Sequence, residues 1–258
     1  MNSILVSIGP ITITWYAALI MSGMLIGLFI TMKELTNNHN INKEVFYDIA
    51  FYGILFGFIG ARTWYVLFSL PYYLDNPLEI IAIWKGGMAI HGGLIGGLIA
   101  IIYFTKKHKI NTMMIFDAIV PSVLLGQSIG RWGNFVNQEA FGGETTETFL
   151  REVLRLPNFI VEGMNINGVY HHPTFLYELI WCSAVAIALI LWGKKLAAGQ
   201  VFSAYVGLYS IGRLFIEIIR IDQANTIAGL RVNVWVSAIV ATLAIANYLR
   251  LGRSSAKI

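Results

Sequence analysis

The sequence predicts an all-α, polytopic membrane protein with seven transmembrane helices. Of its 258 residues, 57% are hydrophobic and only 12% are charged, and the mean hydropathy is +0.67. These values lie well outside the range of soluble globular domains. Seven apolar segments are each close to the ~20 residues that about 30 Å of hydrocarbon requires. We therefore expect a single membrane-embedded domain over residues 1–258.

The first apolar segment begins after a short polar stretch and has no basic leader or small-residue cleavage site. It is predicted to be a retained span and not a removable signal peptide. The seven expected spans are residues 11–32, 45–67, 87–104, 113–129, 174–192, 201–219 and 232–249.

Basic residues gather on one side of these spans. They follow the first, third, fifth and seventh spans, and the positive-inside rule makes that side cytoplasmic. We therefore expect the N-terminus outside and the C-terminus in the cytoplasm. The net charge of +4 then reflects topology and gives no indication of nucleic-acid binding. The residues concerned are Lys33, Lys43, Lys106, Lys107, Lys109, Lys194, Lys195, Arg250, Arg253 and Lys257.

Two outer connections are long enough to form structure of their own. Residues 70–86 contain two prolines and several aromatic residues, which favours a position at the level of the lipid headgroups. Residues 140–172, between the fourth and fifth spans, are polar and are expected to form a small extracytoplasmic head. Residues 162–168 within this head favour a turn.

Most arginines are kept on the outer side, against the topology rule. Arginine presents a planar fork that can hold phosphate or carboxylate through two hydrogen bonds, and its charge survives burial better than that of lysine. The pattern indicates an anionic ligand at the outer side. The alternative for any one arginine is a pair with Glu139, Glu178, Glu217 or a lipid headgroup. The outer arginines are Arg62, Arg131, Arg151, Arg155, Arg213, Arg220 and Arg231.

Residues 130–139, G-R-W-G-N-F-V-N-Q-E, place polar side chains at the end of the fourth span. Burying such groups near hydrocarbon costs several kcal/mol each unless they are paired, so a cluster of them indicates a functional site. The sixth span carries a second polar set at helical spacing, which favours a polar cavity over a simple pair between Arg213 and Glu217. This stripe is Tyr205, Tyr209, Arg213, Glu217 and Arg220.

His91 opens the sequence H-G-G-L-I-G-G at the outer start of the third span. Histidine can act as a general base near neutral pH if a partner orients it. The glycines at positions 92, 93, 96 and 97 are equally typical of a close helix crossing.

In H-P-T-F-L-Y-E, from His172 to Glu178, the carboxylate of Glu178 needs a partner, and an arginine is the natural one. A role of Glu178 in charge balance and helix positioning is as well supported as a role in catalysis.

The one cysteine, Cys182, is expected to be a buried structural thiol, and disulfides and cysteine-based metal sites are excluded.

Together these motifs resemble the bacterial prolipoprotein diacylglyceryl transferase family over nearly the whole chain. The resemblance rests on Trp15 and Tyr16, on M-A-I-H-G-G-L-I-G-G around His91, on the 130–139 block, on H-P-T-F-L-Y-E and on R-L-F-I-E-I-I-R from Arg213. It implies a seven-span enzyme of the bacterial cytoplasmic membrane that faces outward. Such an enzyme transfers diacylglyceryl from phosphatidylglycerol to the lipobox cysteine of a prolipoprotein signal peptide and releases glycerol phosphate.

The resemblance also implies the site residues. The positions that match family motifs are Tyr16, His91, Arg131, Asn134, Glu139, Gly142, Tyr209, Arg213, Glu217 and Arg220. Two departures weaken the transfer of Glu178 and Asp222. Thr174 and Phe175 stand where many relatives have Ser-Gln or Thr-Gln, and Ile221 and Asp222 follow Arg220 where many have Pro-Asp.

The chemistry supports a division of roles. A thiol is largely protonated at neutral pH and needs help to become a thiolate, while the leaving phosphate needs cations. We expect His91, Arg131, Arg213 and Tyr209 to be catalytic, with His91 as the base. The lipid would be bound by Arg131, Asn134, Asn137, Glu139, Gly142, Tyr16, Glu217 and Arg220. The substrate supplies the nucleophile, so no metal or other cofactor is expected.

Two other functions would explain part of the pattern. A transporter of lipids or small anions would also need arginines in a cavity, but it would predict related halves and polar features toward both sides. The chain shows no convincing internal repeat. A non-catalytic scaffold would leave the polar stripe in the sixth span without a purpose.

Overall fold

The structure is a computed structural model, and it describes residues 4–8, 11–221 and 226–255. The chain divides into two compact units. The first comprises Met1–Thr31 and Phe116–Ile258, and the second comprises Met32–Ile115. Asp222, Gln223 and Lys257 lie outside the described residues.

Six of the described helices are long and apolar enough to cross a membrane, which supports a polytopic membrane protein. The helix α4, Ile90–Lys107, covers the expected third span but is not among the six, and it carries Lys106 and Lys107 in its last turn. The seventh span and the orientation therefore remain predictions. The six helices are α1 Trp15–Asn38, α2 Lys43–Phe68, α5 Thr112–Asn137, α7 Thr174–Trp192, α8 Gln200–Ile219 and α9 Val232–Ser255.

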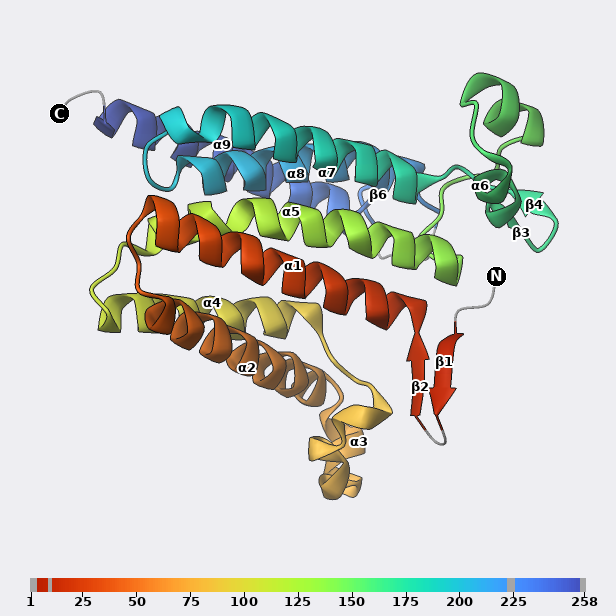
Figure 1. The fold of residues 1–258 in the computed structure, drawn as a ribbon. Helices are drawn as coiled ribbons and strands as arrows, with labels where there is room; N and C mark the ends of the chain where they lie inside the picture. The colour runs from red at the N-terminus through yellow and green to blue at the C-terminus, as the bar shows by residue number, and fades with distance from the viewer. Residues whose placement is uncertain (1–3, 9–10, 222–225, 256–258) are drawn as a thin grey trace. The chain divides into compact units, whose positions relative to one another are not determined.

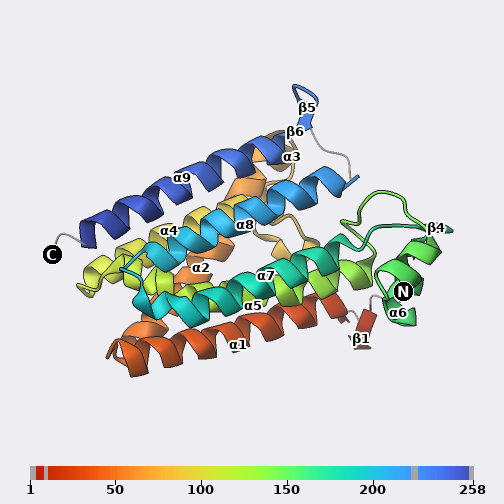
Figure 2. The same ribbon diagram turned by 90° about the horizontal axis from the view of Figure 1, so that it is seen from above.

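In the first unit, α7, α8 and α9 run side by side, with α8 packed against both neighbours (Figures 1 and 2). Val120 and Leu124 of α5 join Cys182, Val185 and Leu189 of α7 in a buried apolar cluster. Cys182 is a free, fully buried cysteine, as expected. A short 3₁₀ turn, Gly193–Lys195, follows α7.

The helices α1 and α5 approach closely because small residues face each other. A side chain at Gly23 would meet the Cα of Gly126, and one at Gly27 would meet Ser122. Ser122 also donates a hydrogen bond to the carbonyl of Gly27 at 2.7 Å and shares one with Thr31 at 2.7 Å. Small and hydroxyl residues are the usual means of helix association inside membranes.

The expected head folds as a small module against the ends of α5 and α7 (Figure 1). Its elements are a π-helical turn Phe149–Val153, α6 Asn158–Gly163, and the strands β3 Asn165–Ile166 and β4 Val169–Tyr170. Asn167 and Gly168 join the strands with φ angles of 54° and 88°, which is the asparagine-glycine turn that two-residue hairpins favour. The turn predicted over residues 162–168 is confirmed.

The all-α prediction misses three short hairpins. The expected start of the first span, residues 11–14, is a strand, because I-T-I-T alternates with a period of two and is β-branched throughout. This strand, β2 Ile11–Thr14, pairs with β1 Ile4–Ile8. The third hairpin joins β5 Thr226–Ile227 to β6 Leu230–Arg231 just before α9.

In the second unit, α2 and α4 form one tightly packed pair. A side chain at Gly92 would collide with the backbone of Gly60, and one at Gly96 with the carbonyl of Phe56. The glycines after His91 therefore make a close helix crossing, which was the structural alternative for this motif. The connection between the two helices contains α3 Leu70–Asp75 and the 3₁₀ turns Pro77–Ile81 and Ile83–Lys85.

Candidate active site

The helix α5 extends eight residues beyond the predicted span and ends at Asn137, so most of the 130–139 block is helical. Arg131 and Asn134 are three residues apart and share a face of the helix. Arg131 Nη1 donates to Asn134 Oδ1 at 3.0 Å, and Asn134 Nδ2 donates to Glu139 Oε1 at 2.9 Å. Asn137 Nδ2 reaches the same oxygen at 3.4 Å. The polar block is thus a connected chain of side chains at the end of the helix.

Glu178, one turn into α7, joins this chain to α8. Its carboxylate is 3% exposed and lies 3.1 Å from Arg131 Nη2 and 3.2 Å from Arg213 Nη1. Tyr209 donates its hydroxyl to Glu178 Oε1 at 3.2 Å. The arginine partner expected for Glu178 is confirmed, and there are two of them. The bridge between α5 and α8 was not predicted.

Glu217 is the second buried carboxylate, with 1% of its side chain exposed. Its Oε2 lies 2.6 Å from Arg213 Nη2 and 3.8 Å from Arg220 Nη1. Its Oε1 lies 3.2 Å from Arg231 Nη1 and accepts a hydrogen bond from Asn233 Nδ2 at 3.0 Å. The pair within α8 was the structural alternative for this stripe, and it is present as one part of a larger network.

Sequence reasoning missed Arg231 and Asn233 as members of the site. Arg231 was counted only among the outer arginines, and its retention against the topology rule was the signal that could have placed it. Asn233 carries no such signal, because a single asparagine at the start of a helix is common as a cap.

Four guanidinium groups therefore meet at two buried carboxylates. The four arginine side chains are 14–21% exposed, whereas both carboxylates are almost fully enclosed. Among the described residues no acceptor reaches the buried Nε of Arg131. Buried donors are almost always paired, so an unpaired one needs an explanation. We call Arg131, Arg213, Arg220, Arg231, Glu178 and Glu217 the arginine cluster.

Comparison with known proteins identifies the family. A model described as prolipoprotein diacylglyceryl transferase matches residues 3–250. The chain belongs to this family. The phosphatidylglycerol–prolipoprotein diacylglyceryl transferases of Staphylococcus aureus strains MSSA476, MW2 and Newman are each 48% identical to it over 239 residues. The matched region covers 93% of this chain and 85% of theirs.

Two further residues that the resemblance implies, Tyr16 and Gly142, contact elements that carry the arginine cluster. Tyr16, at the start of α1, packs on Gly133, where any side chain would collide with the tyrosine ring. Gly142 donates its N–H to the carbonyl of His172 at 3.0 Å and pairs as an isolated bridge with Arg220. A side chain at Gly142 would meet His172 Cβ at 2.8 Å and Ile219 Cγ2 at 3.1 Å. These two glycines allow backbone and ring to approach closely at the edge of the site.

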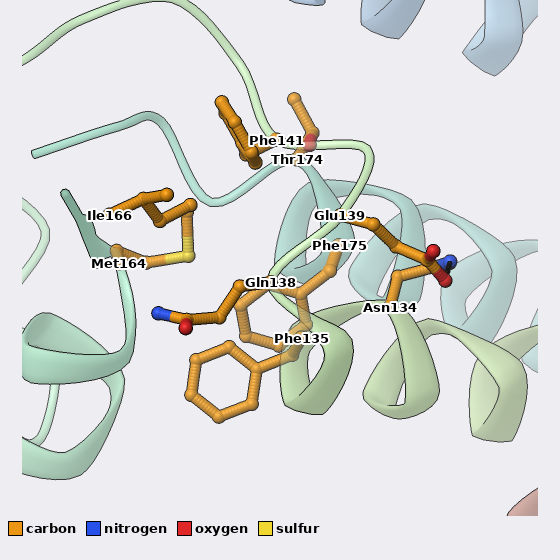
Figure 3. Close-up of a pocket in the computed structure, with 9 residues that line it drawn as sticks. All are labelled: Asn134, Phe135, Gln138, Glu139, Phe141, Met164, Ile166, Thr174 and Phe175. Carbon is orange, nitrogen blue, oxygen red and sulfur yellow. Dashed lines mark hydrogen bonds between the residues drawn. The ribbon is translucent and has the colours of Figure 1, made fainter. Parts of the chain in front are cut away.

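A cavity of about 10 Å³ lies where the head meets the ends of α5 and α7 (Figure 3). It has room for about one water molecule, so it cannot hold a lipid headgroup. Asn134 and Glu139 meet on one side of it, and the Gln138 amide points away toward the head, where it donates to the carbonyl of Gly163 at 2.9 Å. The lining residues are Asn134, Phe135, Gln138, Glu139, Phe141, Met164, Ile166, Thr174 and Phe175.

His91 lies at the start of α4 in the second unit, whereas the arginine cluster belongs to the first. Its side chain is exposed, and its ring lies beside Trp64 with the centroids 6.4 Å apart. Within the described part of the chain, the imidazole has no hydrogen-bond partner.

Two of the arginines that were expected on the outer side serve the fold and do not belong to the arginine cluster. Arg62, only 8% exposed, donates to the backbone carbonyls of Glu79, Ile80, Gly86 and Gly87 and fixes the connection after α3. In the head, Arg151 pairs with Glu147 at 2.6 Å, and this hydrogen bond lowers the pKa of the Glu147 carboxyl.

Asp117 could not be assigned a role from the sequence. It accepts hydrogen bonds from the backbone N–H groups of Gly199 and Phe202 at 2.6 and 2.8 Å, and so caps the start of α8. A carboxylate at this position satisfies N–H groups that a helix start leaves unpaired.

Proposed function

We propose that this protein transfers the diacylglyceryl group of phosphatidylglycerol to the thiol of a prolipoprotein lipobox cysteine, with the arginine cluster as the phosphate site. The meeting of Arg131 and Arg213 at one buried carboxylate, with the buried Nε of Arg131 unpaired among the described residues, carries the proposal. Charged side chains within a membrane protein are costly and usually mark a functional site, and a guanidinium donor without a protein partner can bind an anion. A lipid phosphate has the required charge, and planar guanidinium groups match its geometry.

The reaction is a displacement at the carbon that joins diacylglycerol to the phosphate. The thiolate sulfur forms a bond to that carbon, and the carbon–oxygen bond to phosphate breaks. The electron pair leaves with the oxygen, so that the products are a thioether and glycerol phosphate. Because the phosphodiester becomes a phosphate monoester, negative charge grows on the leaving group. Fixed cations that contact its oxygens therefore stabilise the transition state more than the ground state.

The residue roles follow from this chemistry. Arg131 and Arg213 hold the phosphate, with Arg220 in support, and Tyr209 orients the cluster through Glu178. The glycerol headgroup is bound at the edge formed by Tyr16, Asn134, Asn137, Glu139 and Gly142. His91 takes the thiol proton. No cofactor takes part.

The proposal includes the topology. It takes α4 as the seventh span, the N-terminus outside, the C-terminus in the cytoplasm and residues 140–172 as a head on the outer face of the bacterial cytoplasmic membrane. The head would then lie on the side from which exported signal peptides are modified. The head packs directly on the ends of the helices that carry Arg131 and Glu178, which is consistent with an opening toward that face.

The test uses the purified full-length chain in detergent with phosphatidylglycerol and a lipobox peptide. Mass spectrometry should find the peptide heavier by one diacylglyceryl group in thioether linkage. A peptide with serine in place of the lipobox cysteine should remain unmodified. No product from a folded sample, while a Staphylococcus aureus relative is active in the same detergent, would overturn the proposal.

The role of His91 has a separate test. The variant His91→Gln should turn over slowly at neutral pH and recover part of its rate at alkaline pH, where more of the peptide thiol ionises without a base. Near-native activity at pH 7 would remove His91 from the mechanism and leave the phosphate site unaffected.

A further inference from the structure

We infer that Glu178 is a positioning residue, whose single buried carboxylate sets the separation of Arg131 and Arg213. The inference rests on the proposed function, because it assigns a task within the same phosphate site. The family motifs gave little support for Glu178, since the residues before it depart from the common pattern. Its support comes from the contacts around it.

The three groups come from three different helices. Arg131 lies on α5, Arg213 on α8 and Glu178 on α7. The Glu178 carboxylate contacts both arginines. Each arginine takes a different oxygen, Oε1 for Arg131 and Oε2 for Arg213. Because the two oxygens of a carboxylate are held at a fixed spacing, this arrangement fixes the two forks relative to each other. It leaves the other N–H groups of both forks available for a ligand or a neighbour.

Without an anion between them, the two guanidinium groups would repel each other. The repulsion between like charges is strong in a site of low dielectric constant, and a shared carboxylate reverses its sign. Glu178 thus does more than neutralise one charge. It makes the close pairing of two cations possible before any phosphate arrives, which is the preorganisation that electrostatic catalysis requires.

Glu178 is placed behind the arginines and away from the substrate. Its side chain is 3% exposed, and Tyr209 occupies Oε1 in addition to Arg131. With every contact directed to a protein donor, the carboxylate has no route to a substrate thiol. We therefore assign it no proton transfer.

Contacts of the start of α7 with α5 and the residues that follow it hold Glu178 next to Arg131. Thr174 donates its hydroxyl to the carbonyl of Ala140 at 2.6 Å, just after α5. Phe175 stacks on Phe135 of α5 with the ring centroids 4.5 Å apart. Thr174 and Phe175 thus tie α7 to α5, the helix that carries Arg131, and to the residues that follow it.

Two substitutions test the inference in the lipid-transfer assay. Glu178→Gln keeps the shape and removes the charge, and Glu178→Asp keeps the charge on a shorter side chain. The matched control is Glu147→Gln, which removes an exposed carboxylate from an arginine in the head. Initial rates against phosphatidylglycerol give kcat and KM separately, and thermal unfolding reports whether each variant is folded.

We expect Glu178→Gln to lower kcat about 100-fold, since a misplacement of about 1 Å costs roughly that much, and to change KM by less than about threefold. Glu178→Asp keeps the shared anion but shortens the side chain, so it should recover about tenfold and remain about tenfold below the native kcat. The double variant Glu178→Gln with Arg213→Lys should be no slower than the slower single variant, because residues that act as one unit give non-additive losses.

The inference is overturned if Glu178→Gln matches Glu147→Gln in kcat. It is also overturned if the losses of the double variant multiply, because Glu178 would then act independently of Arg213. If Glu178→Gln does not fold, the decision falls to Glu178→Asp, whose native-like kcat and KM would count against a fixed spacing. A native enzyme that yields no thioether would instead refute the proposed function.

Discussion

Substitution of Arg213 by lysine separates the contribution of charge from that of shape in the arginine cluster. Arg213 spans two carboxylates, with Nη1 at 3.2 Å from Glu178 and Nη2 at 2.6 Å from Glu217. One ammonium group cannot occupy both positions, so at least one charge-assisted hydrogen bond is lost, worth about 1.5–3 kcal/mol. If the same fork holds the phosphate in the transition state, kcat/KM should fall about 10- to 150-fold at about 1.36 kcal/mol per tenfold.

The assay for Arg213→Lys is thioether formation on a lipobox peptide, followed by mass spectrometry over a range of phosphatidylglycerol concentrations. The control is Arg151→Lys, because Arg151 pairs with Glu147 and Asn158 in the head, outside the cluster. The control should stay within about twofold of the native enzyme, as exposed pairs contribute little. An Arg213→Lys enzyme that is folded and within threefold of native activity would show that charge alone suffices, and the bidentate argument would fail.

Three further results are expected. Glu217→Ala removes the buried anion that several guanidinium groups share, and it should lower the free energy of unfolding by about 3–5 kcal/mol. For a chain of this size, each kcal/mol shifts the thermal midpoint by about 2–4 °C. A thermal midpoint in detergent within 2 °C of the native value would therefore contradict the prediction. Gly142→Val should loosen the head, because its Cβ would press on His172 and Ile219, and limited proteolysis should cut within residues 143–171 faster than in the native protein; an unchanged digestion pattern would argue against this. Burial lowers the pKa of the His172 imidazole, so its protonation opposes folding: the stability it contributes is present above its unfolded pKa and is lost as the pH falls below it. The thermal midpoint of unfolding should therefore decrease as the pH is lowered from 7 to 5. An equal decrease for the native protein and for His172→Gln would show that His172 is not the group responsible.

Hydropathy predicted the helices well because it is a local property. Six of the seven expected spans are helices of sufficient length and apolar character. The end of α5 was placed eight residues too early, since the polar block after residue 129 was expected to leave the apolar segment. Those residues stay helical because Arg131 finds partners on the same helix and on α7. Such partners are distant in sequence and cannot be read from a window of neighbouring residues.

The arginines show the same limit. Their expected position on the outer side predicted an anionic site, but the topology rule could not separate the arginines that meet at Glu178 and Glu217 from those that serve the fold. Arg62 has the same local signal as Arg131, an arginine at the end of a span. The Arg62 guanidinium instead donates hydrogen bonds to four backbone carbonyls within residues 79–87. Only the folded connection reveals that difference.

The order of burial within the arginine cluster explains how a membrane protein can keep so many charges at one place. The carboxylates are innermost, at 1–3% exposure, and the guanidinium groups lie outside them at 14–21%. A buried carboxylate without cations would strongly destabilise the fold, and the arginines would repel one another without the carboxylates. Each carboxylate therefore holds together guanidinium groups that would otherwise repel one another, and those groups form the more exposed part of the cluster. In the proposed reaction, negative charge grows on the phosphate as the carbon–oxygen bond breaks, so guanidinium groups that are already held in place favour the leaving phosphate monoester over the phosphodiester of the intact lipid.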